Sequence, residues 1–385
     1  MPICIQNSPT VLKLNIKLEI IKMITKKHIV IGMSGGVDSS VAAWLLKSQG
    51  HKVVGIFMKN WDDDDTDTYC TSKQDFLDAA AASEIIGIEF DAVSFSNEYR
   101  KKVFNDFLHE YSLGRTPNPD VFCNSEIKFK SFLHHSQNLG ADLIATGHYA
   151  KTIKNINGEF ELHKGKDQNK DQSYFLHRLT QKQLRYTTFP LGQYYKKDVR
   201  KLAQEIGLPN ANKRDSTGIC FIGERPFKVF LSKYLKTMSG PVCTTDGKII
   251  GKHDGLSFYT IGQRKGLGIG GIKKSNDFEK TAAPWFVVAK EKKDNRLIVA
   301  QGHDNPFLMS TSLSAINPSW VKGKAPKFEE MEVKIRYRQK TFSCILSVRS
   351  EKFFLKFDSP QRGVTPGQSA VLYKGEECLG GGIIE

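Results

Sequence analysis

The stretch GMSGGVDSS, residues Gly32 to Ser40, follows the apolar run HIVI and precedes the amphipathic run VAAWLLKSQG. This order predicts a strand, a glycine turn and a helix. Gly35 and Gly36 let the backbone approach an anion, while Asp38, Ser39 and Ser40 lie where the helix begins with unpaired N–H groups. A phosphate site is therefore predicted. The stretch lacks the lysine of a Walker loop, GxxxxGK[ST], and does not match the dinucleotide pattern GxGxxG.

Strands and helices alternate over the first half of the chain. Apolar, β-rich runs at residues 28–33, 52–60, 88–95 and 141–150 are separated by segments with helical spacing at residues 39–50, 75–87 and 124–140. This alternation predicts an α/β fold with a parallel sheet, helices on both faces and ligands at the carboxyl ends of the strands.

The sequence pattern changes after Lys213. Glycines become dense, and after Pro284 come short alternating runs such as PWFVVAK, RLIVAQG, VKIRYR, FSCILSV, KFFLKF and SAVLYKG. These runs predict a small antiparallel barrel or sandwich. We expect four parts: an N-terminal extension (1–26), an ATP-binding domain (27–213), a small central, largely β domain (214–284) and a C-terminal domain (285–385). Met23 precedes Lys27 closely, so we expect translation to start downstream of Met1.

Composition narrows the class of protein. The formal net charge is +15, and most of the excess lies after residue 213. This distribution fits a polyanionic partner such as nucleic acid, and it fits general solubility as well. The chain has no apolar run long enough for a membrane span and no signal or transit pattern, so we expect a cytoplasmic protein. The seven cysteines are scattered and form no CxxC pair, which argues against a disulfide framework and a zinc finger.

Two cysteines have distinctive surroundings. Cys123 in GRTPNPDVFCNSEIKF lies near a predicted helix N-terminus, three residues after Asp120. Cys220 in KRDSTGICFIGERPF lies between glycines and follows Lys213 and Arg214. Both settings suit a reactive thiolate, and each alone also suits a packing cysteine. We interpret two further patterns as loops: the acidic run WDDDDTD (61–67) and GLGIGG (266–271), which lacks a following helix.

The loop SGGVDSS resembles the signature of the PP-loop ATP pyrophosphatases, and the whole constellation resembles the tRNA-specific 2-thiouridylases. The matching segments occur in that family's order over residues 27–385: GMSGGVDSSVAAWLL, GIFMKNWD, GRTPNPDVFCN, ATGHYA, KDQSYFL, STGICFIGERPF, YTIGQRKGLGIGG, PWFVVAK, IRYRQ and TPGQSAV. The resemblance implies a PP-loop domain, a central domain and a C-terminal antiparallel β-barrel that binds tRNA.

The resemblance also implies roles for individual residues. ATP would contact Gly32, Met33, Ser34, Gly35, Gly36, Val37, Asp38, Ser39, Met58 and Gly147. The target base would meet Asn118, Pro119 and Asp120, with Asp120 as an acid or base. Cys123 would be the catalytic nucleophile and Cys220 the persulfide carrier. Positions that would touch tRNA are His148, Lys170, Asp171, Gln172, Arg336, Tyr337 and Gln368.

The implied reaction has two halves. ATP, with Mg²⁺, adenylates the C2 oxygen of the wobble uridine, and persulfide sulfur delivered to Cys220 by a sulfur-carrier protein then replaces that oxygen. Cys123 either frees sulfide from the persulfide or resolves the product state as a transient disulfide with Cys220. Two rivals remain: another PP-loop enzyme that adds an amine, such as an amidotransferase-type or lysidine synthetase, and a non-catalytic RNA-binding protein that senses ATP.

Overall fold

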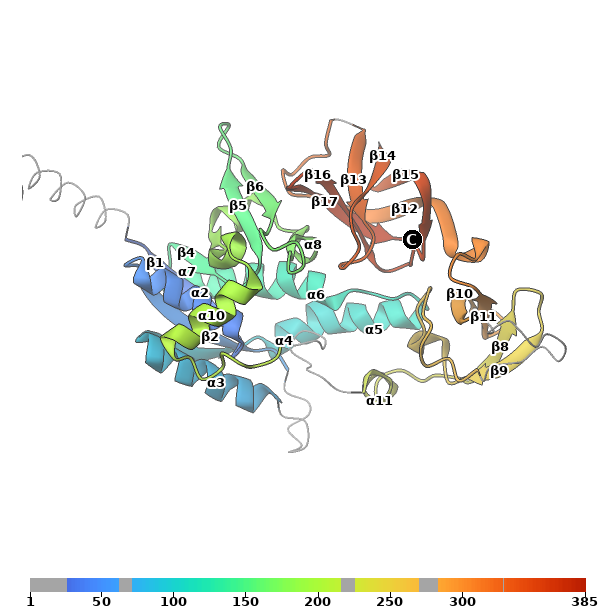
Figure 1. Ribbon diagram of the computed structural model, residues 1–385, viewed down its shortest axis with the longest axis horizontal. Helices are drawn as coiled ribbons and strands as arrows, with labels where there is room; N and C mark the ends of the chain where they lie inside the picture. The colour runs from blue at the N-terminus through green and yellow to red at the C-terminus, as the bar shows by residue number, and fades with distance from the viewer. Residues whose placement is uncertain (1–25, 62–70, 216–225, 270–282, 328) are drawn as a thin grey trace, which may run out of the picture.

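The computed structural model describes residues 26–61, 71–215, 226–269, 283–327 and 329–385. Cys220, Cys4, Cys70, the acidic residues 62–67 and nearly all of the predicted N-terminal extension lie outside these ranges. Figure 1 shows a nucleotide-binding fold at the left, a barrel at the upper right and a smaller sheet at the lower right. No helix in the described ranges combines the length and the apolar character needed to cross a membrane.

The first sheet is parallel. The strand order is β3-β2-β1-β4-β7, with β1 (His28–Met33) between β2 (Lys52–Lys59) and β4 (Leu143–Ala145). The outer strands are β3 (Glu89–Ser94) and β7 (Thr187–Thr188). Because the chain leaves β1 towards β2 and returns on the other side as β4, the carboxyl ends of β1 and β4 flank a topological switch point, where ligands bind in this class of fold.

Helices cover both faces of this sheet, as the sequence predicts. Alternate residues of β1 face opposite ways, as expected for a strand: Ile29 and Ile31 pack with α2 (Val37–Ser48), α3 (Thr71–Ile86) and α10 (Lys196–Ile206), whereas Val30 packs on the opposite face. The opposite face is covered by α4 (Ser96–Tyr99), η1 (Arg100–Phe104), α5 (Asn105–Ser112), α6 (Pro119–Phe122), η2 (Cys123–Ser131) and α7 (Phe132–Asn138).

The helix that carries Cys123 begins earlier than the sequence predicts. It starts at Pro119, runs through π-helical η2 and ends with α7, whereas the predicted segment begins at Asn124. Proline is well suited to the first helical position, because its missing N–H has no partner there in any case. Asp120 therefore lies in the first turn and Cys123 just after it.

A hairpin leaves the parallel sheet after β4 and joins another sheet. It consists of β5 (Ala150–Lys154) and β6 (Phe160–Lys164), and it stands beside the barrel in Figure 1. The chain then returns to α10 through short elements: α8 (Ser173–Leu176), α9 (Gln181–Arg185), β7 and η3 (Pro190–Gln193).

The middle of the chain forms a four-stranded sheet with the order β10-β11-β8-β9. Its strands are β8 (Gly240–Thr244), β9 (Ile249–His253), β10 (Trp285–Glu291) and β11 (Arg296–Gln301). Short helices α11 (Phe227–Ser232) and η4 (Leu256–Phe258) precede and follow the first pair. Because β11 pairs with β8, this sheet spans the 284/285 boundary expected from the sequence. The division into four parts remains a prediction.

The later C-terminal strands form an antiparallel barrel, as predicted, but the first two runs of that prediction, PWFVVAK and RLIVAQG, become β10 and β11 of the middle sheet instead. Neighbouring strands pair in the order β12-β15-β14-β13-β16-β17, and β17 pairs back with β12 to close it. The strands are β12 (Met309–Trp320), β13 (Glu330–Lys334), β14 (Phe342–Arg349), β15 (Lys352–Arg362), β16 (Ser369–Lys374) and β17 (Glu377–Ile384); η5 (Pro306–Leu308) precedes them. The predicted strand VKIRYR is wrong in its second half, because β13 ends at Lys334 and residues 335–339 form a bend and turn.

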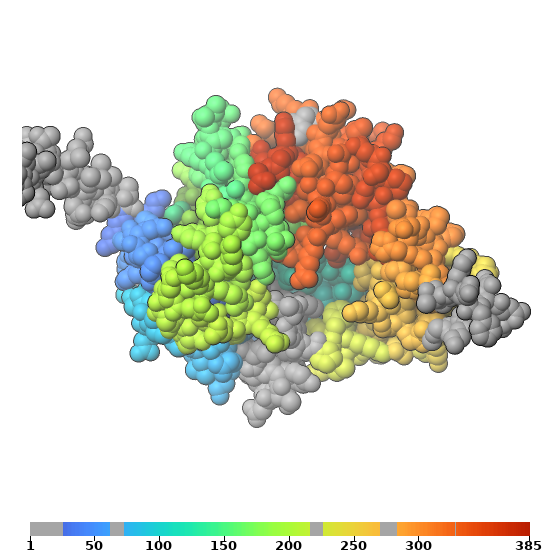
Figure 2. Space-filling view, in the orientation of Figure 1, coloured from blue at the N-terminus to red at the C-terminus, as the bar shows by residue number. Residues whose placement is uncertain are grey.

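The barrel and the nucleotide-binding fold share a sheet. Strand β17 pairs with β6 of the projecting hairpin, and the two surfaces meet in Figure 2. Lys322 bridges the two parts, with its Nζ 2.8 Å from Glu161 Oε1 of β6 and 2.7 Å from Glu377 Oε1 of β17. Burial opposes ionisation of Glu161, but hydrogen bonds from Lys322, His163 and Asn155 outweigh it and lower the pKa of Glu161 to about 2. The hairpin is thus fixed to the barrel by both backbone and charge.

The Glu161 cluster predicts an acid-sensitive junction. Because the pKa of Glu161 is lower in the folded chain than its ordinary value of 4.5, its contribution is complete above about pH 4.5 and is lost as the pH falls towards 2. Glu161→Gln should reduce the free energy of unfolding by about 1 kcal/mol at pH 7. Urea denaturation should show this difference shrinking below pH 4.5. The exposed Glu351→Gln variant is the control, and a pH-independent difference would contradict the interpretation.

Candidate active site

The glycine loop after β1 packs closely against α3. Gly35 has φ +73°, and a Cβ atom there would lie 2.2 Å from the Asp75 carbonyl oxygen. Only glycine fits such a position without strain. Helix α2 then begins at Val37, and its N-cap residue Gly36 offers no side chain to its first N–H groups. These groups, with the positive end of the helix dipole, favour an anion.

Serine side chains brace the loop from inside. Ser39 Oγ accepts a hydrogen bond from the Ser34 backbone N–H at 3.1 Å and donates to the Gly36 carbonyl oxygen at 3.0 Å. Ser40 Oγ also donates to the Gly36 carbonyl oxygen, at 3.2 Å. Asn210, beyond α10, donates to the Gly35 carbonyl oxygen at 3.1 Å. The loop's own hydroxyl groups and the distant amide of Asn210 therefore help to hold its shape.

The other residues predicted to contact ATP surround this loop. Gly147 follows β4, and a Cβ atom there would lie 2.7 Å from the Ser39 backbone nitrogen and 3.1 Å from Asp38 Cβ. Met58, near the end of β2, lies against Gly32, where a Cβ atom would be 2.8 Å from Met58 Cε. The segments after β1 and β4 thus meet at the switch point. Their contact with ATP itself remains a prediction.

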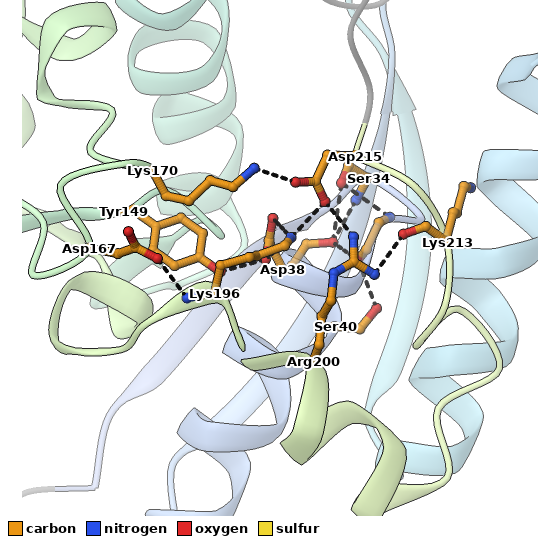
Figure 3. A network of polar contacts seen from close by, with 12 residues as sticks. Ser34, Asp38, Ser40, Tyr149, Asp167, Lys170, Lys196, Arg200, Lys213 and Asp215 are labelled. Carbon is orange, nitrogen blue, oxygen red and sulfur yellow. Dashed lines mark hydrogen bonds and ion pairs between the residues drawn. The ribbon is translucent and has the colours of Figure 1, made fainter. Parts of the chain in front are cut away.

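Asp38 is the centre of a polar network shown in Figure 3. Lys196 Nζ, at the start of α10, lies 2.7 Å from each Asp38 carboxylate oxygen, and Tyr149 donates its hydroxyl to Asp38 Oδ1 at 2.8 Å. The same Lys196 Nζ lies 2.8 Å from Asp215 Oδ1. Burial, and then the Asp38 charge, raise the pKa of Tyr149, so this hydroxyl remains a donor.

Asp215 forms ion pairs with two further side chains. Lys170 Nζ lies 2.6 Å from its Oδ2, and the Arg200 guanidinium lies 2.9 Å from its Oδ1. Burial opposes ionisation of Asp215, but hydrogen bonds from Lys170 and Lys196 outweigh it and lower the pKa of Asp215 to about 2. Three cations thus meet one carboxylate beside the glycine loop.

Lys213 stabilises the glycine loop, and its positive charge is paired with carboxylates. Its Nζ lies 2.6 Å from Asp75 Oδ1 and 2.5 Å from Asp78 Oδ2, both on α3, and donates to the Gly35 carbonyl oxygen at 3.3 Å. The sequence suggests an electropositive setting from Lys213 and Arg214. For Lys213 this interpretation is incomplete, because two carboxylates compensate its charge.

The segment around Asn118 is held by the barrel. The Thr116 backbone N–H donates to the Pro366 carbonyl oxygen at 2.9 Å, and Gln368 Nε2 donates to the Thr116 carbonyl oxygen at 2.7 Å. Pro119 and Asp120 follow as the first residues of α6. Cys123 is fully buried and belongs to the apolar cluster of this face of the sheet. Its thiol does not reach solvent in this conformation.

Most positions predicted to touch tRNA take part in contacts between parts of the fold. Arg336 donates to the carbonyl oxygens of Ile261 and Gly363, so it links the middle sheet to the barrel. Asp171 is buried and lies 3.2 Å from Lys334 Nζ of β13. Tyr337 packs on Phe175, with ring centroids 4.4 Å apart.

The remaining predicted contacts lie nearer the parallel sheet. Gln172 Oε1 accepts a hydrogen bond from the Tyr149 backbone N–H at 3.0 Å. His148 is buried, and its Nδ1 lies 2.8 Å from Thr146 Oγ1. Burial, and then the Lys128 charge, hold the pKa of His148 well below its ordinary value, so the ring is neutral. The tRNA contacts of these residues remain predictions.

Comparisons with known proteins cover nearly all of the chain after residue 26. Residues 27–224 match the family described as "tRNA methyl transferase HUP domain", residues 228–301 its "PRC-barrel domain", and residues 310–384 the "Aminomethyltransferase beta-barrel domain". The protein named tRNA-specific 2-thiouridylase MnmA in Herminiimonas arsenicoxydans is 56% identical over 93% of this chain and 98% of its own length. The protein of the same name in Bordetella petrii is 57% identical over 93% of this chain and 96% of its own.

The chain belongs to the tRNA-specific 2-thiouridylase family. The domain descriptions speak of methyl transfer and the relatives' names of thiolation; we follow the relatives, since their similarity spans nearly the whole of both chains. Among solved structures, the NMN synthetase from Francisella tularensis shares 18% identity, with a TM-score of 0.32 over 56% of this chain and 78% of its own. A score this low has no bearing on the site.

Several charged residues around the glycine loop were not predicted from the sequence. Lys196, Arg200 and Asp215 surround the glycine loop, yet no motif in the sequence marks them. Lys196 and Arg200 are four residues apart on α10 and so lie on one face of the helix. This spacing is the one feature of the sequence that could have indicated a shared role for the two residues. It is common on solvated helices and therefore does not single them out. Their position beside Asp38 follows from the packing of α10 against α2.

Gly35 provides a test of the loop's geometry. Gly35→Ala places a Cβ atom against the Asp75 carbonyl oxygen at a positive φ, so it should reduce the free energy of unfolding by about 1–3 kcal/mol and weaken ATP binding. Gly36→Ala is the matched control for stability, because φ is −88° there and the nearest atom, Ser34 Oγ, is 3.4 Å away. Chemical denaturation and calorimetric titration with ATP measure both effects. Equal stability of the two variants would contradict the close packing.

Proposed function

We propose that the protein catalyses ATP-dependent 2-thiolation of the wobble uridine in tRNA anticodons. One observation carries the proposal: a chain at least 56% identical to proteins named tRNA-specific 2-thiouridylases holds an uncapped helix N-terminus and a glycine loop at the switch point of its parallel sheet. The loop suits the phosphates of ATP, and the family supplies the identity of the acceptor.

The first half-reaction is adenylation. The C2 oxygen of the uridine attacks the α-phosphorus, the bond between the α-phosphorus and the bridging oxygen breaks, and pyrophosphate leaves. The uncapped N–H groups at the start of α2 would hold the phosphates, and Gly147 permits close approach between the two loops. This step converts a poor leaving group, the C2 oxygen, into AMP.

Magnesium belongs to this proposal as the counter-ion of ATP, where it neutralises phosphate charge. Asp38 is the carboxylate of the loop, and it is engaged by Lys196. Within the described ranges no group of three histidine, cysteine, aspartate or glutamate side chains is arranged to hold a metal ion. The phosphates and water would therefore supply most of the ligands.

The second half-reaction transfers sulfur from a persulfide on Cys220. In one route, the Cys123 thiolate attacks the inner sulfur of Cys220, and the released sulfide displaces AMP from C2. In the other route, the terminal persulfide sulfur displaces AMP, and Cys123 then cleaves the S–S bond to free the thiolated base. Both routes end in a Cys123–Cys220 disulfide that an external thiol must reduce. Because Cys123 is buried, each route also requires a rearrangement that exposes its thiol.

The proposed chemistry requires two macromolecular partners, the tRNA and a sulfur-carrier protein. The tRNA would bind along the junction where the segment around Asn118 meets the barrel, in contact with Asp120 and Cys123. The residues predicted to contact tRNA, including Arg336 and Gln368, hold this junction together, so they would act partly by positioning. A sulfur-carrier protein would load Cys220. We place the reaction in the cytoplasm.

Mass spectrometry of tRNA nucleosides tests the function. Wild-type protein incubated with tRNA, ATP, magnesium and a persulfide donor should form 2-thiouridine, whereas Cys220→Ser and Cys123→Ser should form at least about a hundredfold less, because each removes a reacting sulfur. ATP consumption on tRNA without sulfur in any nucleoside would indicate a different PP-loop enzyme. Tight tRNA binding without any turnover would indicate a non-catalytic RNA-binding protein.

Cys344→Ala is the matched control. Cys344 is buried in the barrel core, and burial, and then the Asp358 charge, raise the pKa of its thiol to about 12, so it remains protonated and unreactive at neutral pH. Its replacement should leave 2-thiouridine formation unchanged. Equal losses in all three cysteine variants would point to a general effect on folding and would contradict the assigned roles.

A further inference from the structure

The glycine loop has no basic residue of its own, since residues 32–40 read GMSGGVDSS. A triphosphate carries several negative charges, and backbone N–H groups alone do not neutralise them. Lys196 lies in the position to supply the missing cation. Its side chain is only 10% exposed, and its Nζ reaches the carboxylate of Asp38 on the first turn of α2.

Asp215 is surrounded by more positive charge than it can balance. Lys170, Lys196 and Arg200 all contact its two oxygens at 2.6–2.9 Å. Only Lys196 has a second carboxylate partner within this network, Asp38. Figure 3 shows the three cationic groups pointing towards Asp215 beside Ser34. Several cations that converge on two oxygen atoms form the arrangement that a phosphate group prefers.

We propose that Lys196 binds the pyrophosphate end of ATP, and that Asp215 is an internal anion that occupies this cation cluster until the phosphates displace it. The inference rests on the proposed function only for the identity of the nucleotide. It assigns two positions, Lys196 and Asp215, that the resemblance leaves without a role, and it makes Asp215 the anionic partner that these cations have before ATP binds.

The supporting contacts fit this exchange. Arg200 is held independently of Asp215, because its guanidinium also donates to the carbonyl oxygens of Ala211 and Lys213 at 3.1 and 3.0 Å. The Lys196 backbone N–H donates to Asp167 Oδ2 at 2.9 Å, which fixes the start of α10. Lys196 Nζ also keeps its contact with Asp38, so both cations retain a partner when the Asp215 carboxylate moves away. Asp215 itself is about one-third exposed and is not locked in the core.

Titration calorimetry with inorganic pyrophosphate in magnesium-free buffer tests the exchange, since the protein must then supply the cations. Asp215→Asn should bind pyrophosphate about tenfold more tightly than wild type, because it removes the competing charge. Asp215→Glu, which keeps the charge, should not bind more tightly. Lys196→Met should bind about tenfold more weakly. Lys201→Met is the control for loss of a positive charge from α10, because Lys201 is exposed and pairs only with Glu205 in the described structure; it should leave affinity unchanged.

The direction of the Asp215→Asn effect decides the proposal. If Asp215 had only a structural role, Asp215→Asn would bind pyrophosphate as tightly as wild type or more weakly. Either result overturns the inference, provided that the variant has a wild-type circular dichroism spectrum. If Asp215→Asn unfolds, Lys196→Met against Lys201→Met remains decisive, and equal affinities overturn it. Absence of pyrophosphate binding by wild type also overturns it. Failure of 2-thiouridine formation would contradict the proposed function alone, since pyrophosphate binding requires neither tRNA nor sulfur.

Discussion

The rest of the structure depends on an unpaired helix N-terminus at the centre of a parallel sheet. The first N–H groups of α2 have no side-chain cap, and they lie at the carboxyl ends of the paired strands β1 and β4, the switch point of the sheet. Keeping them available requires that neighbouring backbones come close without covering them. Gly35 against Asp75, and Gly147 against Asp38 and Ser39, meet this requirement, because a Cβ atom at either glycine would collide with backbone. The loop is thus held in shape while the first N–H groups of α2 stay available to an anion.

A second constraint comes from the position of the segment that carries Asp120 and Cys123. Its start, Thr116, is bonded to the barrel loop through Pro366 and Gln368, and its hydroxyl lies 3.2 Å from that of Thr260 in the middle part. Three regions far apart in sequence therefore define one short segment. The barrel consequently helps to fix the position of the segment that carries Asp120 and Cys123. The shared β17–β6 pairing strengthens the same junction.

Charge at the nucleotide site is also supplied from a distance. Asp38 and Lys196 are separated by 158 residues, and Lys170 and Asp215 by 45. Two carboxylates pair with three cations here, which lowers the cost of partly burying these charges and leaves an excess of positive charge. Phosphate binding at this site is then an exchange of anions, and its strength depends on internal competition as well as on the number of donors.

The sequence by itself determined the α/β alternation, the phosphate loop, the late change to antiparallel strands and, through its resemblance, the family. These features are local or periodic: glycines at a strand–helix turn, apolar spacing of two or 3.6 residues, and short motifs in a fixed order. Prediction failed where long-range packing decides, as at residues 335–339, where a β-like run ends in a turn because Arg336 leaves the sheet to bond Ile261 and Gly363. Only the tertiary structure decided that Cys123 is buried and that Lys196, Arg200 and Lys170 converge on Asp215. The physical reason is that no local pattern encodes which distant side chains a packed helix brings to a loop.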